Sequence, residues 1–204
     1  MSKIAIIGAT GRAGSQLLAE ALRRGHQVTA IARGATSLAA QPGQRNLAVD
    51  LHDTPALTAA LAGHAVVISS ARFDGVPPQA IIGATLAADV PRLLVVGGAA
   101  SLLLPDGTRL FDSPQFPAAY RAEAAGGIAF LDALRAQTAL DWSFLSPSAL
   151  FDGQQRTGRF RLGQEQLLSD AAGQSHISFP DFAIAMLDEL ERPAHSRQRF
   201  TVGY

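Results

Sequence analysis

The chain has 204 residues, of which 48% are hydrophobic and 17% are charged, so it can bury one sizeable core. Its 17 basic and 17 acidic residues balance, which leaves no positive field for nucleic acid or an acidic membrane surface. The absence of cysteine excludes disulfides, thiolate metal sites and cysteine nucleophiles.

A strand is predicted at residues 3–7, which leaves no room for a signal peptide before it. The longest apolar run, residues 93–104, contains two glycines and a serine and is too short to cross a bilayer. We therefore expect a cytoplasmic protein with one domain over residues 1–204 and no membrane partner. Both a monomer and a homodimer are compatible with the sequence.

The stretch KIAIIGATGRAG, residues 3–14, predicts a strand, a tight loop and the start of a helix over residues 12–24. This spacing is typical of a dinucleotide site. Gly8 allows a sharp turn, Gly11 allows the backbone to approach a pyrophosphate, and Gly14 allows close helix packing. The N–H groups of the first helical turn then face the phosphates. Alternatively, the glycines make only a tight turn in another α/β protein.

The next strand, predicted at residues 27–32, bears on the choice of cofactor. A site for NAD has a carboxylate near the end of this strand to bind the ribose hydroxyls. No acidic residue occurs between Glu20 and Asp50, whereas Arg33 follows the strand and Arg12 lies in the glycine loop. Since a guanidinium group matches a 2′-phosphate, the pattern favours NADP(H) over NAD(H). The alternative is that Arg33 is a solvated loop cation.

A short strand is predicted at residues 47–49, followed by Asp50, whose carboxylate would reach the adenine amino group. Thr54 and Pro55 predict the capped start of a helix that stops at Gly63.

The strand at residues 65–71 is continuously apolar, as expected when both faces of a parallel sheet are covered. Its small terminal residues suit contact with a ribose and a nicotinamide. A helix over residues 78–88 and a strand over 92–98 follow. The alternation predicts an α/β fold of the Rossmann type, a doubly wound parallel sheet with helices on both faces. The ligand crevice should lie along the carboxyl edge of that sheet.

The irregular stretch 99–117 begins at this edge and is long enough to indicate a functional loop. The helix predicted at 118–137 carries Tyr120 in its first turn and Gly126–Gly127 inside, which indicates close packing or a kink. The strand DWSFL, residues 141–145, ends at Ser146 and Pro147.

The remaining chain predicts a small strand and turn segment over the crevice, a substrate-side insertion at residues 151–178. Ser178 should cap a final helix that ends at Glu191, and residues 199–202 should form a last edge strand. The short strands expected in the insertion are residues 157–162, 166–169 and 175–177.

Five stretches of the chain resemble the NmrA-like atypical short-chain dehydrogenases. They are GATGRAG, the pair Asp50-Leu51, GGAASL, DWSFLSPSALF and the closing DFAIAMLDELERPAH…RFTVGY. Within that family, the sequence is similar to small proteins described as NAD(P)H-flavin reductases, related to the flavin and biliverdin-IXβ reductase. The resemblance covers essentially the whole chain and implies a Rossmann fold and an oxidoreductase activity.

The resemblance also implies the cofactor contacts, which run along the crevice from pyrophosphate to nicotinamide. For the pyrophosphate and the 2′-phosphate region they are Gly8, Thr10, Gly11, Arg12, Ala13, Gly14 and Arg33. For the adenine they are Asp50 and Leu51, for the ribose Ser69, Ser70 and Ala71, and near the nicotinamide Gly97, Gly98, Ser146 and Pro147.

One departure from the better-known short-chain dehydrogenases bears on the chemistry. Those enzymes use a serine, a tyrosine and a lysine four residues after the tyrosine. Ser101 and Tyr120 stand at plausible catalytic positions, but the fourth residue after Tyr120 is Ala124. A tyrosine alone, with an ordinary pKa of about 10, is a poor acid or base near neutral pH.

Hydride transfer to a flavin or a similar planar, quinone-like acceptor does not need that tyrosine and lysine pair, because solvent can deliver the proton. The loop 99–117, with Phe111 and Phe116, and the segment 151–162 would form the acceptor pocket. Flavin would then be a substrate rather than a tightly bound cofactor. The alternative is that the two aromatic rings pack in the core, which is the more frequent role of such residues.

Two other functions remain open. An NADP(H)-binding redox sensor would bind the dinucleotide without turnover and act through partner proteins. A sugar-nucleotide epimerase or dehydratase is disfavoured by the short C-terminal part. The five histidines show no metal-ligand spacing, and no G-x-S-x-G motif of a hydrolase occurs.

Overall fold

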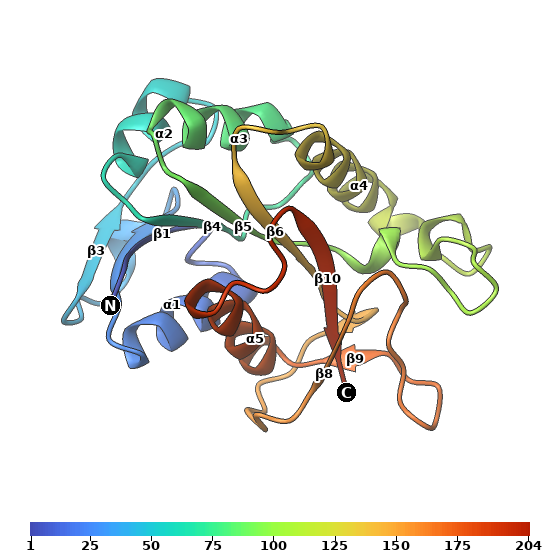
Figure 1. Ribbon diagram of the computed structural model, residues 1–204. Coiled ribbons are helices and arrows are strands. Elements are labelled where there is room, and N and C mark those ends of the chain that lie inside the picture. The colour runs from blue at the N-terminus through green and yellow to red at the C-terminus, as the bar shows by residue number, and fades with distance from the viewer.

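The computed structural model describes all 204 residues and contains an eight-stranded sheet with helices on both faces (Figure 1). The strand order is β3-β2-β1-β4-β5-β6-β10-β8, and only β8, at the edge, runs antiparallel to its neighbour. The order reverses direction between β1 and β4, which confirms the predicted doubly wound Rossmann fold. The strands are β1 Lys3–Ile7, β2 Gln27–Ile31, β3 Gln44–Leu47, β4 Val66–Ser69, β5 Arg92–Val96, β6 Asp141–Ser146, β8 Arg161–Gly163 and β10 Gln198–Gly203.

Two hydrophobic clusters, one on each face of the sheet, make the core. The cluster of 22 buried residues lies between the sheet and two helices, α1 (Arg12–Arg23) and α5 (Phe179–Glu191). The cluster of 18 buried residues lies under α2 (Thr54–Leu61), α3 (Pro78–Ala87) and α4 (Arg121–Arg135). Figure 1 shows α1 and α5 on one side and α2 to α4 on the other. None of these helices has the length and apolar character needed to cross a membrane.

The central strands are apolar because both of their faces are covered. Every residue of β4 and every residue of β5 is buried. This continuous burial is the property that the sequence pattern predicted. The parallel pairing of these strands places their carboxyl ends at one edge of the sheet.

The helix ends follow from local chemistry, with one correction. Ser178 caps α5 as predicted, and its Oγ accepts a hydrogen bond from the Asp181 N–H at 3.2 Å. The predicted start of α2 was one residue late, because Asp53 rather than Thr54 is the cap and accepts from the Ala56 N–H at 3.0 Å. Asp is as good a cap as Thr, and both precede Pro55.

The predicted strand at residues 47–49 was wrong, since β3 occupies Gln44–Leu47. This strand pairs only with β2, so polar residues are tolerated in it and its apolar signal is weak. Residues 166–169 form no strand and make only an isolated bridge between Gln166 and Leu103.

The last strand was predicted as an edge strand, which was also wrong. β10 pairs with β6 on one side and with β8 on the other, so β8 forms the edge. A separate pair, β7 (Leu150–Phe151) and β9 (His176–Ile177), lies beyond the end of β6. Strand pairing of this kind depends on residues far apart in the chain.

The helix predicted at 118–137 is shorter in the structure. A 3-10 helix over Ala118–Tyr120 precedes α4, which ends at Arg135. Gly126 and Gly127 allow close packing, as predicted: a Cβ at Gly126 would lie 2.8 Å from the carbonyl oxygen of Phe73.

A buried polar network joins α5 to the sheet. Arg92, at the start of β5, donates to Glu189 Oε1 over 2.8 Å, and Ser143 Oγ donates to the same oxygen over 3.0 Å. Burial raises the pKa of Glu189, but the hydrogen bonds from His195, Ala194 and Ser143 outweigh it, and the net pKa lies below its ordinary value. Glu189 is therefore held as a carboxylate among its donors.

His64 is buried and neutral at the opposite edge of the sheet from the crevice. Its two ring nitrogens lie 2.8 Å from the Leu61 carbonyl oxygen and 2.8 Å from Thr29 Oγ1. Burial lowers the pKa of His64, and the nearby cation Lys3 lowers it further. The folded state therefore disfavours protonation of this ring.

We expect the stability of the fold to decrease as pH falls below about 6.5, the ordinary pKa of histidine. In this window the unfolded chain binds the proton that folded His64 resists, so the free energy of unfolding decreases. The substitution His64→Gln should flatten this part of the pH profile, measured by urea unfolding between about pH 7.5 and pH 5.5. The matched control His52→Gln, at an exposed histidine, should keep the wild-type slope. An unchanged slope in His64→Gln would contradict the assignment.

Candidate functional site

The glycine loop between β1 and α1 is shaped by close backbone contacts. Gly8 has φ +76°, and a Cβ there would lie 2.4 Å from the Ser70 carbonyl oxygen. A Cβ at Gly14 would lie 2.1 Å from the Gly8 carbonyl oxygen. A side chain at either position would push the loop away from the strands and from the helix.

The start of α1 is open to a ligand. Gly11, the cap residue, provides no side-chain hydrogen bond. The first N–H to find a carbonyl within the helix is that of Ser15, which donates to Gly11 over 2.9 Å. The three preceding N–H groups, of Arg12, Ala13 and Gly14, therefore have no partner in the helix. Together with the helix dipole, they can bind phosphate oxygens.

Two arginines border this loop without forming ion pairs. Arg12 and Arg33 are exposed, and neither lies within salt-bridge distance of a carboxylate. The guanidinium group of Arg12 lies over the ring of Phe179, 5.5 Å from its centroid. Both cations are thus available for the 2′-phosphate that the sequence pattern predicts.

Asp50 and Leu51, the predicted adenine contacts, lie in the segment after β3, and their contact with adenine stays a prediction. The Asp50 carboxylate is exposed, and its Oδ1 accepts from the His52 N–H over 3.0 Å. The second carboxylate oxygen is free to accept from a ligand.

The ends of β1 and β4 lie side by side at the carboxyl edge of the sheet. Ser69 is buried at the end of β4, and the Ser70 N–H donates to the Ile7 carbonyl over 2.8 Å. The structure therefore brings Ser69, Ser70 and Ala71 to the same edge as Gly8. The predicted ribose contacts stay a prediction.

The two glycines after β5 have different surroundings. A Cβ at Gly97 would lie 2.2 Å from the ring of Phe144, whereas nothing lies within 4 Å of a Cβ at Gly98. Gly97 is needed for core packing, and Gly98 borders open space. The family resemblance implied one role for both glycines, a position near the nicotinamide.

Ser146 carries an unusual hydroxyl at the end of β6. Its side chain is fully buried, and its Oγ has no hydrogen-bond partner within the protein. Because this oxygen atom is not accessible at the surface, its hydroxyl does not face a ligand in this structure. The adjacent Pro147 is also buried.

The two catalytic candidates are not joined by a hydrogen bond. Ser101 Oγ accepts from Arg199 Nη1 over 3.2 Å, and Arg199 also pairs with Glu165. Tyr120 is 65% exposed, and its hydroxyl makes no hydrogen bond within the protein. The structure thus holds Ser101 to the sheet and leaves Tyr120 at the surface.

The loop that follows β4 is fixed by contacts that the sequence analysis missed. The N–H groups of Phe73 and Asp74 donate to the Glu123 carboxylate over 2.9 and 3.0 Å. The Phe73 ring packs on Gly127 and lies 5.5 Å from the ring of Phe130. In the sequence, only the glycine pair of α4 indicated that another segment packs closely against this helix.

The aromatic residues of the long loop pack on each other. The ring centroids of Phe111 and Phe116 lie 5.4 Å apart. Arg121 covers both, 5.0 Å from one centroid and 5.8 Å from the other. Whether this cluster receives an acceptor stays a prediction.

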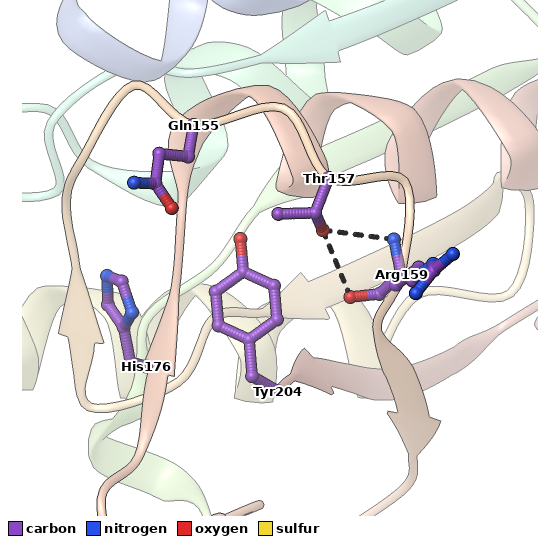
Figure 2. Close-up of a pocket in the computed structure, with 5 residues that line it drawn as sticks. All are labelled: Gln155, Thr157, Arg159, His176 and Tyr204. Carbon is purple, nitrogen blue, oxygen red and sulfur yellow. Dashed lines mark hydrogen bonds between the residues drawn. The ribbon is translucent and has the colours of Figure 1, made fainter.

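A cleft of about 630 Å³ opens beside the end of β10 (Figure 2). Figure 2 shows the Tyr204 hydroxyl pointing toward the segment that carries Gln155 and Thr157. Three of its residues lie in the predicted acceptor segment, but His176 and Tyr204 were missed because no periodic or motif signal marks them. The lining residues are Gln155, Thr157, Arg159, His176 and Tyr204.

A polar network lies under this cleft. The Tyr204 hydroxyl lies 2.8 Å from Asp181 Oδ2, and Asp181 is fully buried while accepting from the N–H groups of Thr157 and Gly158. Burial raises the pKa of Tyr204. His176 lies 2.8 Å from Asp152 Oδ1. These contacts fix the floor of the cleft and leave the Arg159 side chain exposed at its rim.

A profile of a protein family, described as NAD(P)H-binding, matches residues 8–193 of the chain. Three solved structures are also similar over the whole chain. A "putative exported protein" from Burkholderia pseudomallei is 41% identical, with 100% of both chains covered and a TM-score of 0.90. A "putative epimerase" from Bacteroides thetaiotaomicron is 38% identical, covers 100% of this chain and 97% of its own, and has a TM-score of 0.92. A "putative NADH-flavin reductase" from Streptococcus pneumoniae is 33% identical, covers 100% of this chain and 99% of its own, and has a TM-score of 0.84.

The contrast between Gly97 and Gly98 gives a matched test of the site geometry. We expect Gly97→Ala to lower the free energy of unfolding by about 1–3 kcal/mol, because the new methyl group overlaps the buried Phe144 ring. Gly98→Ala should change it by less than about 0.5 kcal/mol, since the methyl group enters open space. Urea unfolding of both variants measures the difference. Equal losses in the two variants would contradict the geometry.

Proposed function

The chain belongs to the NAD(P)H-binding protein family, and from this premise we propose that it is a reductase that uses NADPH to reduce a flavin or a similar planar acceptor. The observation that carries the cofactor assignment is the cradle formed by Gly8, Gly11 and Gly14. It combines a sharp turn, free N–H groups and an open helix terminus. The resemblance to NmrA-like atypical short-chain dehydrogenases agrees with this family and fold.

We propose that a dinucleotide lies extended along the carboxyl edge of the sheet. We propose that the loop from Gly8 to Gly14, including Thr10, holds the pyrophosphate. Asp50 and Leu51 would contact the adenine, and Ser69 to Ala71 the ribose. Gly98, which borders open space, would meet the nicotinamide, with the backbone of Ser146 and Pro147 beside it.

The preference for NADP(H) rests on charge. Arg12 and Arg33 are exposed and unpaired, and the chain offers no carboxylate after β2 to bind the ribose hydroxyls. A 2′-phosphate would pair with Arg33 through two parallel hydrogen bonds. The similar protein from Streptococcus pneumoniae is described as an NADH-flavin reductase, so the preference for NADP(H) needs a direct test.

The acceptor site is proposed on the far side of the nicotinamide, beyond the end of β6. The cleft lined by Gln155, Thr157 and Arg159 lies at this end of the sheet, where β10 ends at Gly203. When bound, the reduced dinucleotide supplies a hydride. The protein would hold the acceptor plane against the cofactor, and solvent would supply the proton that balances the reduction. The short C-terminal part gives no support to an epimerase, although one similar structure carries that description.

Tyr120 and Ser101 would contribute little acid–base chemistry. Tyr120 is exposed, and Ala124 stands where other short-chain dehydrogenases have lysine. This observation favours a second candidate function, an NADP(H)-binding redox sensor that acts through a partner protein. A cytoplasmic location is part of both proposals, and the Burkholderia protein described as exported is the finding against it.

The proposed activity is tested in two steps. Titration with NADPH and NADH first measures binding. The loss of NADPH absorbance is then followed with FMN, with riboflavin and with a small quinone as acceptors. Acceptor-dependent oxidation supports the reductase, whereas tight binding without turnover on any acceptor supports the sensor. Failure to bind either dinucleotide would contradict both.

We expect Arg33→Asp to weaken NADPH binding by about 10–100-fold and to leave NADH binding nearly unchanged. The loss reflects the charge-assisted hydrogen bonds between the guanidinium group and the 2′-phosphate, which NADH lacks. The control Arg45→Asp reverses an exposed, unpaired arginine on β3 and should leave the ratio of the two dissociation constants unchanged. Equal losses for both dinucleotides in Arg33→Asp would exclude the proposed contact.

A further inference from the structure

A second cleft, of about 220 Å³, lies near the starts of β6 and β10, away from the carboxyl edge of those strands. Arg135 at the end of α4, Arg197 before β10 and Arg199 within β10 all line it. Its other walls are Trp142, Glu165 and two glutamines. The family assignment and the proposed reductase activity give this cleft no role.

Positive charge exceeds negative charge in the cleft. Three guanidinium groups face one carboxylate, although the whole chain carries equal numbers of basic and acidic residues. The hydrogen bond from Arg199 holds the pKa of Glu165 below its usual range, so this carboxylate stays charged. Among the lining residues, one carboxylate therefore faces three cations, and Asp132, beside the cleft, also pairs with Arg135.

Glu165 neutralises mainly the buried arginine. It accepts from Arg199 Nε over 3.0 Å, and its Oε2 lies 3.6 Å from Arg135 Nη2. The Arg199 side chain is almost fully buried, so this pair forms the back wall of the cleft.

The other two arginines have fewer close hydrogen-bond partners than Arg199. Arg135 lies 3.5 Å from Asp132, one turn earlier on the same exposed helix face. Arg197 makes no ion pair, and its Nη2 donates to the Thr138 carbonyl over 2.7 Å. Each guanidinium carries five N–H donors, so both retain donors that can face the cleft.

Guanidinium groups bind tetrahedral oxyanions well, because their parallel N–H groups match pairs of phosphate oxygens. We propose that this cleft is an anion site that binds phosphate, either as the free ion or as the head of a small phosphate monoester. Arg135 and Arg197 bind the oxyanion directly. Glu165, which pairs with Arg199 at the back of the cleft, competes with the anion for Arg135.

Trp142 makes the proposal directly testable. It is the only tryptophan in the chain, and it lines this cleft, so its fluorescence reports on the site. The experiment titrates the protein, without added dinucleotide, with inorganic phosphate and separately with methyl phosphate. Chloride keeps the ionic strength constant. A saturable change in fluorescence supports the site, and a flat or purely linear response to both probes overturns it.

The two probes identify the form of the ligand. Tighter binding of inorganic phosphate assigns the site to the free ion. Equal or tighter binding of methyl phosphate shows that the cleft accepts an ester, so the head group of a small metabolite is its ligand. Either result supports an anion site.

Substitutions of the lining residues provide a second test of the anion site. The double variant Arg135→Gln, Arg197→Gln should bind phosphate at least about tenfold more weakly. The control Arg45→Gln removes an exposed, unpaired arginine elsewhere and should bind like the wild type. Wild-type affinity in the double variant would overturn the proposal, provided that its far-UV circular dichroism shows the native fold.

Glu165→Gln provides a test of opposite sign. The amide keeps the size of the side chain and its acceptor for Arg199, but it removes the competing charge. Phosphate binding should therefore become a few-fold tighter. Weaker binding in this variant would overturn the proposed competition and with it the site. A merely structural role of Glu165 would predict no gain in affinity.

Discussion

The structure depends on a close approach of three backbone segments at the carboxyl edge of the sheet. The loop after β1, the segment after β4 and the first turn of α1 meet where no Cβ atom fits at Gly8 or Gly14. This contact sets the position of α1 on the sheet. It also leaves the first N–H groups of that helix unpaired at the edge, so one steric constraint produces both the packing and the proposed phosphate site.

The rest of the fold holds this edge in place. The central strands are buried on both faces, with α1 and α5 on one side and α2, α3 and α4 on the other. Apolar packing is not directional, so hydrogen bonds and ion pairs set the positions of individual elements relative to the sheet. Arg92, Ser143 and His195 hold Glu189 of α5, and Glu123 of α4 holds the loop that carries Phe73. These contacts fix the elements around the carboxyl edge, as a site that works mainly by orientation requires.

The two halves of the candidate site differ in character. The half proposed for the dinucleotide consists of backbone groups, glycines and two unpaired arginines. Its capacity to bind phosphate comes mainly from the backbone N–H groups at the start of α1, which the fold itself places there. The half proposed for the acceptor is formed by irregular segments, and its cleft is lined by polar side chains from three separate stretches. The exposed Tyr120 and the tethered Ser101 offer no acid–base pair, so chemistry at this site would rest on proximity and on solvent.

The sequence by itself determined the α/β class, the order of the main elements and the glycine cradle, because these features depend on neighbours in the chain. Continuous apolar runs marked the buried strands, and Ser178 marked the start of α5. The tertiary structure alone decided that β10 lies inside the sheet and that Ser101 accepts a hydrogen bond from Arg199. It also decided that Gly97 packs against the Phe144 ring, whereas Gly98 borders open space. It also brought His176 and Tyr204 to one cleft and three arginines to another. Those contacts join residues far apart in the chain, where neither periodicity nor local propensity carries a signal.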